Sequence, residues 1–430
     1  MTEDLMSYEY LLHILTHSLV FIYLLNQKLK LTLFNIFVIP YFLIFGIGFY
    51  FYVEEYPYDN FTSVRNLAAL NISLCSIFIF LGKLIFQISF PSNKTSAKII
   101  ANAQRIINKW LLISLSIFVA LVLVLALFVY GGLDAIKIIT ASRGQLNPLE
   151  LKEIRFDSGV HGWVKPVFSY VNTSLSRLFP FLLIGYGTLH NNKYYKWFGY
   201  FIIILISLAE ISTLHKSTFI YYLLQVIIFY ALLKKWKLNT RFMIPVIAII
   251  FTILMGYYAF LTSTDGIISI VGEISSRIVN EPHRCLNEYL KFWPEYQPHR
   301  YGMNIRVIHG LFSSQEFEPA FKTVIYQYTD PASPLLGTWP ALFIADAWVD
   351  FSFFGVIIYS FVFGLMLELL DRYTRNNDDY LAYSLIASLF ISVTIPLENS
   401  LITAFIGGGI ITLPILVWML IKKKKVRVKG

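Results

Sequence analysis

The sequence is poor in charge. Asp, Glu, Lys and Arg make up 14% of its 430 residues, whereas soluble domains carry roughly 25%. Hydrophobic residues make up 57% and aromatic residues 17%. A soluble globular protein is therefore excluded, and the composition indicates a polytopic membrane protein. Membrane topology also explains the net charge of +9 better than nucleic-acid binding does.

Cysteine is almost absent, with only Cys75 and Cys285. Two cysteines exclude a disulfide framework and a metal site built from cysteines. We expect Cys75 within a membrane span and Cys285 outside one, both as free thiols. The first residues, Met1 to Tyr8, are acidic and lack a small-residue cleavage site, so they do not resemble a signal peptide.

Several sequence motifs are also absent. The chain has no P-loop, dinucleotide fingerprint, HExxH or nucleophile elbow, and no DxD pair that could hold a metal-bound nucleotide sugar in an outward loop. These absences disfavour covalent and metal-dependent mechanisms and predict no cofactor and no metal. No inverted repeat, low-complexity segment or separate soluble domain is present, so we expect one polytopic domain over residues 1–430.

The main feature of the sequence is a series of long apolar runs. About 20 apolar residues cross a bilayer as a helix, and this criterion predicts an all-α membrane bundle of about eleven transmembrane helices. The candidate spans are 8–25, 31–52, 66–90, 110–131, 164–189, 196–212, 217–233, 242–262, 340–369, 379–397 and 401–421.

Lys and Arg in the connections predict the orientation, because cytoplasmic loops are enriched in both. Alternate connections and the tail hold 20 of the 35 Lys and Arg residues, against 13 on the other side and two within spans. This split predicts a cytoplasmic C-terminus and, with an odd number of spans, an N-terminus outside. Two long connections, 132–163 and 263–339, then face outward, and long loops are often functional.

The larger loop contains a predicted amphipathic helix near 270–294. Charged residues recur there at steps of three and four, which places them on one helical face. Pro282 predicts a kink, since it lacks an N–H. The charged face fits a polar, anionic substrate at the membrane boundary, or a solvated, salt-bridged surface. Its members are Glu273, Arg277, Glu281, Arg284, Glu288, Lys291 and Glu295.

Arginines in both outward loops predict an anion site. Arg presents a planar fork that matches phosphate oxygens, although pairing with the neighbouring glutamates is the alternative. In the larger loop His283 and His299 are candidate bases. The candidate phosphate ligands there are Arg277, Arg284, Arg300 and Arg306, with Arg143 and Arg155 in the smaller loop.

Ionisable residues within or beside the spans are further candidates, because they are costly in a membrane. Arg177 lies near the middle of its span and needs a cavity or a partner such as Glu210. Asp346, Asp350 and Glu398 lie nearer the outer side, where a carboxylate is a candidate general base or a simple helix cap. His215 and Lys216 are further candidates for binding the substrate.

The chain resembles the Wzy-type polymerases of O-antigen and capsule repeat units. The resemblance covers the architecture of many spans with two Arg-bearing outward loops. Locally it is carried by the polar turn Ser212-Thr213-Leu214-His215-Lys216-Ser217, and by the run from Gly337-Thr338-Trp339-Pro340 through Asp346, Asp350, Phe351 and Gly355 to Gly364. The family's pattern of Arg, ten residues and Gly is not reproduced.

The resemblance implies a metal-independent, GT-C-like membrane glycosyltransferase in the bacterial cytoplasmic membrane. Such an enzyme uses undecaprenyl-pyrophosphate-linked oligosaccharides as donor and acceptor, and its partner is a chain-length regulator. Two alternatives are a ligase that moves finished glycan to a lipid or protein acceptor, and a flippase for lipid-linked oligosaccharides. A flippase would need charge along a path on both sides of the membrane, and here charge and histidine concentrate on one.

Overall fold

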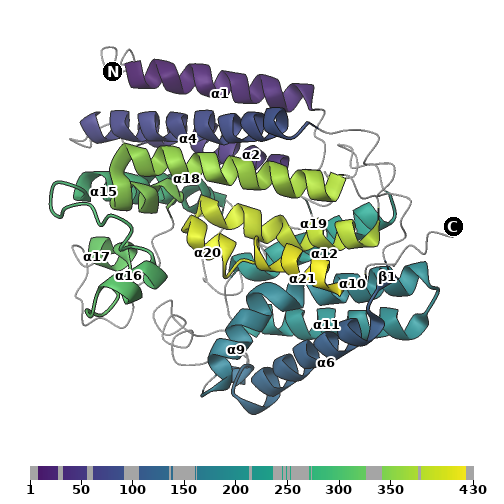
Figure 1. The fold of residues 1–430 in the computed structure, drawn as a ribbon. Helices are drawn as coiled ribbons and strands as arrows, with labels where there is room; N and C mark the ends of the chain where they lie inside the picture. Colours follow the sequence, from purple (N-terminus) through teal and green to yellow (C-terminus); the bar gives the residue numbers. More distant parts are fainter. Residues whose placement is uncertain are drawn as a thin grey trace. The chain divides into compact units, whose positions relative to one another are not determined.

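The protein is an all-α membrane protein, as the sequence predicts (Figure 1). The structure, a computed structural model, describes residues 8–27, 32–55, 62–91, 106–134, 137–138, 160, 162–212, 216–235, 245, 248, 252, 271–272, 274–325, 341–375 and 379–422. Within these ranges the elements are helices, apart from one short antiparallel pair between β1 (Ile106–Ile107) and β2 (Ile421–Lys422).

Eight helical stretches among the described residues are long and apolar enough to cross a membrane. Each coincides with a predicted span, because the apolar run that a bilayer requires is a local property of the sequence. The stretches are Tyr8–Asn26, Leu33–Val53, Ser63–Ser89, Lys109–Val129, Val164–Leu189, Lys193–Ser212, Ile344–Thr374 and Tyr380–Leu397.

Three predicted spans do not appear among these eight. The apolar part of α12 (Lys216–Leu233) covers only Thr218–Leu233. The run 401–421 is divided into α20 (Leu401–Phe405) and α21 (Thr412–Leu420). Three successive glycines lie between them, and Gly409 has φ +90°, a conformation that ends a helix. The span 242–262 lies outside the described residues except at 245, 248 and 252.

The chain forms two compact units, each built from discontinuous segments. Unit 1 comprises 1–92, 271–372 and 393–404, and unit 2 comprises 93–270, 373–392 and 405–430.

Unit 1 contains a bundle of apolar helices in which α1 (Tyr8–Asn26) packs along α4 (Thr62–Ser89). The long helix α18 (Ile344–Arg375) crosses α4 very closely. A Cβ on Gly82 would stand 2.2 Å from the Phe361 carbonyl oxygen, and one on Gly364 would stand 2.1 Å from that of Ile79. Small residues allow such close helix crossings in membrane proteins.

The helix that follows α1 in the chain, α2 (Leu33–Tyr41), is capped at its start by a side chain. At the start of α2, the N–H groups of Leu33 and Phe34 donate to the carboxylate of Asp371, which lies in α18. The distances are 2.5 Å and 3.2 Å. The carboxylate thus satisfies two backbone donors that a helix start leaves without partners. A π-helical turn, η2 (Phe42–Ile47), follows Pro40 and leads into α3 (Gly48–Glu55).

The part of unit 1 outside the spans is built from short helices. The predicted amphipathic stretch forms a π-helical turn, η5 (Ser276–Asn280), and α15 (Glu281–Phe292). Pro282 lies at the junction, where the sequence places a kink. Cys285, Leu286, Tyr289 and Leu290 are buried, whereas Arg277 and Arg284 are exposed. Two further helices follow, α16 (Arg306–Phe312) and α17 (Ala320–Ile325).

Unit 2 contains α6 (Lys109–Val124), η3 (Leu125–Val129), α9 (Val164–Tyr170), η4 (Val171–Leu175), α10 (Ser176–Leu189), α11 (Lys193–Ser212), α12, α21 and most of α19 (Tyr380–Thr394). Within it, α10 packs extensively on α11. Arg177 and Glu210 pair across this contact, as the sequence anticipates. Cys75 lies in a span, Cys285 lies outside one, and both are free, as expected. Both are also buried.

Candidate functional site

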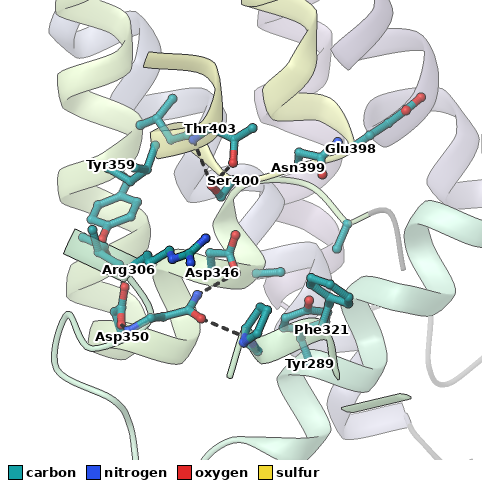
Figure 2. Close-up of a pocket in the computed structure, with 18 of the residues that line it drawn as sticks. Tyr289, Arg306, Phe321, Asp346, Asp350, Tyr359, Glu398, Asn399, Ser400 and Thr403 are labelled. Atoms are coloured by element: carbon teal, nitrogen blue, oxygen red, sulfur yellow. Dashed lines mark hydrogen bonds between the residues drawn. The ribbon is translucent and has the colours of Figure 1, made fainter. Parts of the chain in front are cut away.

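A cavity of about 300 Å³ lies in unit 1 (Figure 2). Its wall combines carboxylates, one arginine, hydroxyl groups, amides and aromatic rings that come from several segments of unit 1. The lining residues include Tyr289, Asn304, Arg306, Phe317, Phe321, Asp346, Asp350, Tyr359, Glu398, Asn399, Ser400 and Thr403.

A break in α18 creates one side of this cavity. Phe351 (φ −140°, ψ 19°) and Ser352 (φ 54°, ψ −140°) leave the helical conformation, so the helix is kinked about two turns after its start. The break interrupts the backbone hydrogen-bond ladder. The carbonyls of Val349 and Asp350 accept instead from the N–H groups of Arg300 and Tyr301, each at 2.9 Å. The segment 300–305 is thereby attached to α18.

The Asp350 carboxylate fixes the same segment and has a donor on each of its oxygens. Its Oδ1 accepts from the backbone N–H groups of Gly302 and Asn304, each at 3.1 Å, and its Oδ2 accepts from the Tyr359 hydroxyl at 3.2 Å. The residue is 1% exposed. Asp350 therefore holds the segment in place, because both of its oxygens already have donors.

Asp346 lies one helical turn before Asp350 and differs from it. The Asn304 side chain donates to Asp346 Oδ1 at 2.7 Å. No other donor to this carboxylate is found in the described part of the chain, so Oδ2 is open. Asp346 lines the cavity with that oxygen available to accept a proton or a hydrogen bond.

Arg306 brings a positive charge to the same cavity. It begins α16, is exposed, and faces the cavity together with Asp346 and Tyr359 (Figure 2). Its guanidinium has neither a hydrogen bond nor an ion pair with any described residue. All of its donors are therefore available to an anionic group.

Arg300 supports the wall without lining it. Its guanidinium donates to the Glu318 carbonyl at 2.6 Å and to the Thr323 hydroxyl at 2.8 Å, and it lies over the Trp293 ring at 5.7 Å. Burial lowers the pKa of Arg300, and the charges of Glu318, Asp350 and Asp346 oppose this effect. These contacts use two of the five N–H donors of the guanidinium.

The remaining wall comes from α15 and from the segment before α20. Burial and the negative charge of Asp346 raise the pKa of Tyr289 well above its ordinary value, so its hydroxyl stays protonated. The Phe343 N–H donates to the Pro396 carbonyl at 2.8 Å, which holds the following residues beside the start of α18. Ser400 caps α20 by accepting from the Thr403 N–H at 3.1 Å, and exposed Glu398 precedes it.

The structure places the two candidate histidines away from the cavity wall. His283 is 1% exposed, packs against Phe45, Phe49 and Tyr52, and donates through Nε2 to the Ile44 carbonyl at 2.9 Å. Burial lowers its pKa to about 4. His299 contacts the Trp348 ring and lies 3.3 Å from the Val349 carbonyl oxygen.

The structure brings together four of the candidate residues: Arg306, Asp346, Asp350 and Glu398 line one cavity. Arg277 and Arg284 are exposed and do not line it. Arg143, Arg155 and His215 lie outside the described residues, as does the side chain of Lys216.

Sequence reasoning missed Asn304 and Tyr359, which hold the two carboxylates. Asn304 lies in an irregular segment and Tyr359 lies in an apolar span, so no local pattern distinguishes either. Only the i, i+4 spacing of Asp346 and Asp350 signals that two carboxylates share one helical face.

In the described part of the chain, no three His, Cys, Asp or Glu side chains are grouped so that they could hold a metal ion. No protein-family model matches the sequence, and neither the curated proteins nor the solved structures include a match.

Proposed function

We propose that this protein is a glycosyltransferase of the bacterial cytoplasmic membrane that joins undecaprenyl-pyrophosphate-linked oligosaccharide units into a surface polysaccharide. The reaction takes place on the outer face of the membrane. The distribution of Lys and Arg predicts that the 263–339 connection lies on this face. A chain-length regulator is the proposed protein partner. One observation carries the proposal: Arg306, Asp346 and Glu398 come from three distant segments and line a single cavity beside apolar helices.

The cavity offers the two functions that glycosyl transfer from a pyrophosphate requires. The open Oδ2 of Asp346 can accept the proton of an acceptor hydroxyl. The unpaired guanidinium of Arg306 can bind a departing pyrophosphate through its planar fork. Both residues line the cavity, so base and anion ligand face one reacting centre.

In the proposed reaction the acceptor hydroxyl oxygen attacks the anomeric carbon of the donor sugar. Its proton passes to Asp346 Oδ2. The bond between the anomeric carbon and the pyrophosphate oxygen breaks, and the lipid pyrophosphate leaves with the electron pair while Arg306 stabilises its charge. The hydroxyl groups of Ser400 and Tyr289 line the cavity and are placed to bind sugar hydroxyls.

The proposal is tested in cells that lack their own copy of the protein and express each variant at a matched level. Asp346→Asn removes the base, which typically costs 10²- to 10⁴-fold in rate. Arg306→Ala removes a charge-assisted contact, which corresponds to about 10- to 150-fold. Both variants should abolish or shorten the polysaccharide ladder on a gel. Arg284→Ala, at an exposed arginine outside the cavity, is the matched control and should leave the ladder intact.

An unchanged ladder in both cavity variants would show that this cavity is not the polymerisation site. A ligase gives a different result: single repeat units and finished chains then both fail to reach the final acceptor. A flippase gives a third, because lipid-linked units would accumulate on the cytoplasmic side of the membrane.

A further inference from the structure

Asn304 makes three hydrogen bonds that together join the cavity walls. Its side-chain nitrogen donates to Asp346 Oδ1 at 2.7 Å, and its side-chain oxygen accepts from the Ala320 N–H at 3.1 Å. Its backbone N–H donates to Asp350 Oδ1 at 3.1 Å. One residue thus connects α18 to the start of α17 and lines the cavity itself.

These bonds determine which oxygen of Asp346 faces the cavity. A carboxylate on a helix can rotate about its terminal torsion, which is broad and roughly two-fold. The short bond from Asn304 holds one oxygen. Asn304 is itself fixed, since the Ala320 N–H donates to its side-chain oxygen and its own backbone N–H donates to Asp350. The orientation of Asp346 is therefore set by a rigid segment.

We infer that Asn304 is a positioning residue that aims the open oxygen of Asp346 at the acceptor hydroxyl. The inference rests on the proposed function, in which Asp346 takes the acceptor proton. Asn304 binds no substrate atom in this role; it acts through the carboxylate. A proton acceptor must lie within hydrogen-bond reach of the group it deprotonates, so its orientation affects turnover more than substrate binding.

A purely structural role for Asn304 is the alternative, since the Ala320 contact alone would attach α17 to the segment. Asn304→Asp separates the two roles. The new side chain keeps the shape and the oxygen that accepts from the Ala320 N–H. It replaces the nitrogen donor beside Asp346 with a carboxylate oxygen, so the hydrogen bond to the base is lost and a second carboxylate stands next to it.

The cavity also offers a matched control for the added charge. Asn399 lines the same cavity, is exposed, and its side chain has no hydrogen bond with a described residue. Asn399→Asp introduces the same charge at the same cavity without altering the contact to Asp346. The difference between the two variants therefore reports on the loss of the donor next to Asp346, beyond the effect of a charge elsewhere in the cavity.

The experiment measures initial rates of the purified full-length protein in detergent, with the undecaprenyl-pyrophosphate-linked repeat unit of the source strain as the probe. Asn304→Asp should lower kcat by about 10- to 100-fold, the range of one charge-assisted hydrogen bond, and change KM by less than about threefold. Asn399→Asp should stay within about threefold of wild type in both constants. Thermal unfolding of each variant confirms that it is folded.

Equal kcat losses in the two variants, or a loss confined to KM, would overturn the positioning role. If Asn304→Asp does not fold, Asn304→Ala is compared with Asn399→Ala by the same criteria. Asp346→Asn separates the two ideas: turnover at the wild-type rate contradicts the proposed function itself. A dead Asp346→Asn beside a fully active Asn304→Asp contradicts only the role of Asn304.

Discussion

Arg177 and Glu210 form a buried ion pair within the helices of unit 2. The Arg177 Nη2 lies 3.6 Å from the Glu210 Oε1, and the two side chains are 7% and 2% exposed. Asn172 also donates to Glu210 Oε1, at 3.5 Å. A charge inside an apolar bundle is expensive unless it is paired, so this contact explains how α10 and α11 each tolerate an ionisable residue.

Removing one partner should destabilise unit 2 strongly. Arg177→Met leaves the Glu210 carboxylate buried without its counter-charge, and we expect a loss of about 3–5 kcal/mol. The double variant Arg177→Met/Glu210→Met should be much less affected, because no lone charge remains. Thermal unfolding of the purified protein in detergent measures both. Lys137→Met breaks the exposed pair with Asp134 and should cost no more than about 1 kcal/mol.

The positive-inside pattern predicts opposite locations for two neighbouring connections. Reporter fusions truncated after Lys216 and after Arg241 should report the outer and the cytoplasmic side, respectively, because α12 lies between them. An enzyme reporter that is active only outside and a fluorescent reporter that is active only inside give independent readings. The same side for both fusions would move the 263–339 connection to the cytoplasm.

Asp350 and Asp346 should respond differently to alanine, although they lie one turn apart. Asp350→Ala removes the acceptor for three donors and should cost at least about 2 kcal/mol. Hydrogen exchange should accelerate at the amides of Gly302 and Asn304, which lose their bonds to the carboxylate. Asp346→Ala removes one hydrogen bond and should leave these two amides protected. Equal exchange in both variants would contradict the anchoring role of Asp350.

His283 should make stability depend on pH in the acidic range. Its pKa is lowered from 6.5 to about 4 by burial, so the unfolded chain binds the proton more readily than the folded protein does. The contribution of neutral His283 to the free energy of unfolding is therefore complete above pH 6.5 and falls as the pH drops toward 4. The loss for this group is about 3 kcal/mol. His283→Gln keeps a donor for the Ile44 carbonyl and should flatten the decline of melting temperature between pH 6.5 and 4.5. An identical slope in wild type and variant would show that His283 does not titrate as proposed.

The sequence determined the membrane class and most of the spans. A helix in a bilayer needs a run of apolar residues that satisfies its own backbone, and both requirements are local. A charge within a span is costly, so the sequence also predicted that Arg177 needs a partner such as Glu210, and the two residues are paired. The predicted span 401–421 is divided because the three glycines between α20 and α21 permit a backbone turn that hydrophobicity does not register.

Only the tertiary structure decided which polar residues meet. The charged face of the amphipathic helix, Glu273 to Glu295, is the clearest periodic pattern in the sequence. Its arginines, Arg277 and Arg284, nevertheless do not line the cavity. Arg306, Asp346 and Glu398 do, because a break at Ser352 and the hydrogen bonds of Asn304 and Pro396 bring their segments together. Such contacts depend on backbone groups that are exposed where a helix is interrupted, and on partners far away in the sequence. The apolar pattern of a span, in contrast, consists of consecutive residues and can be recognised locally.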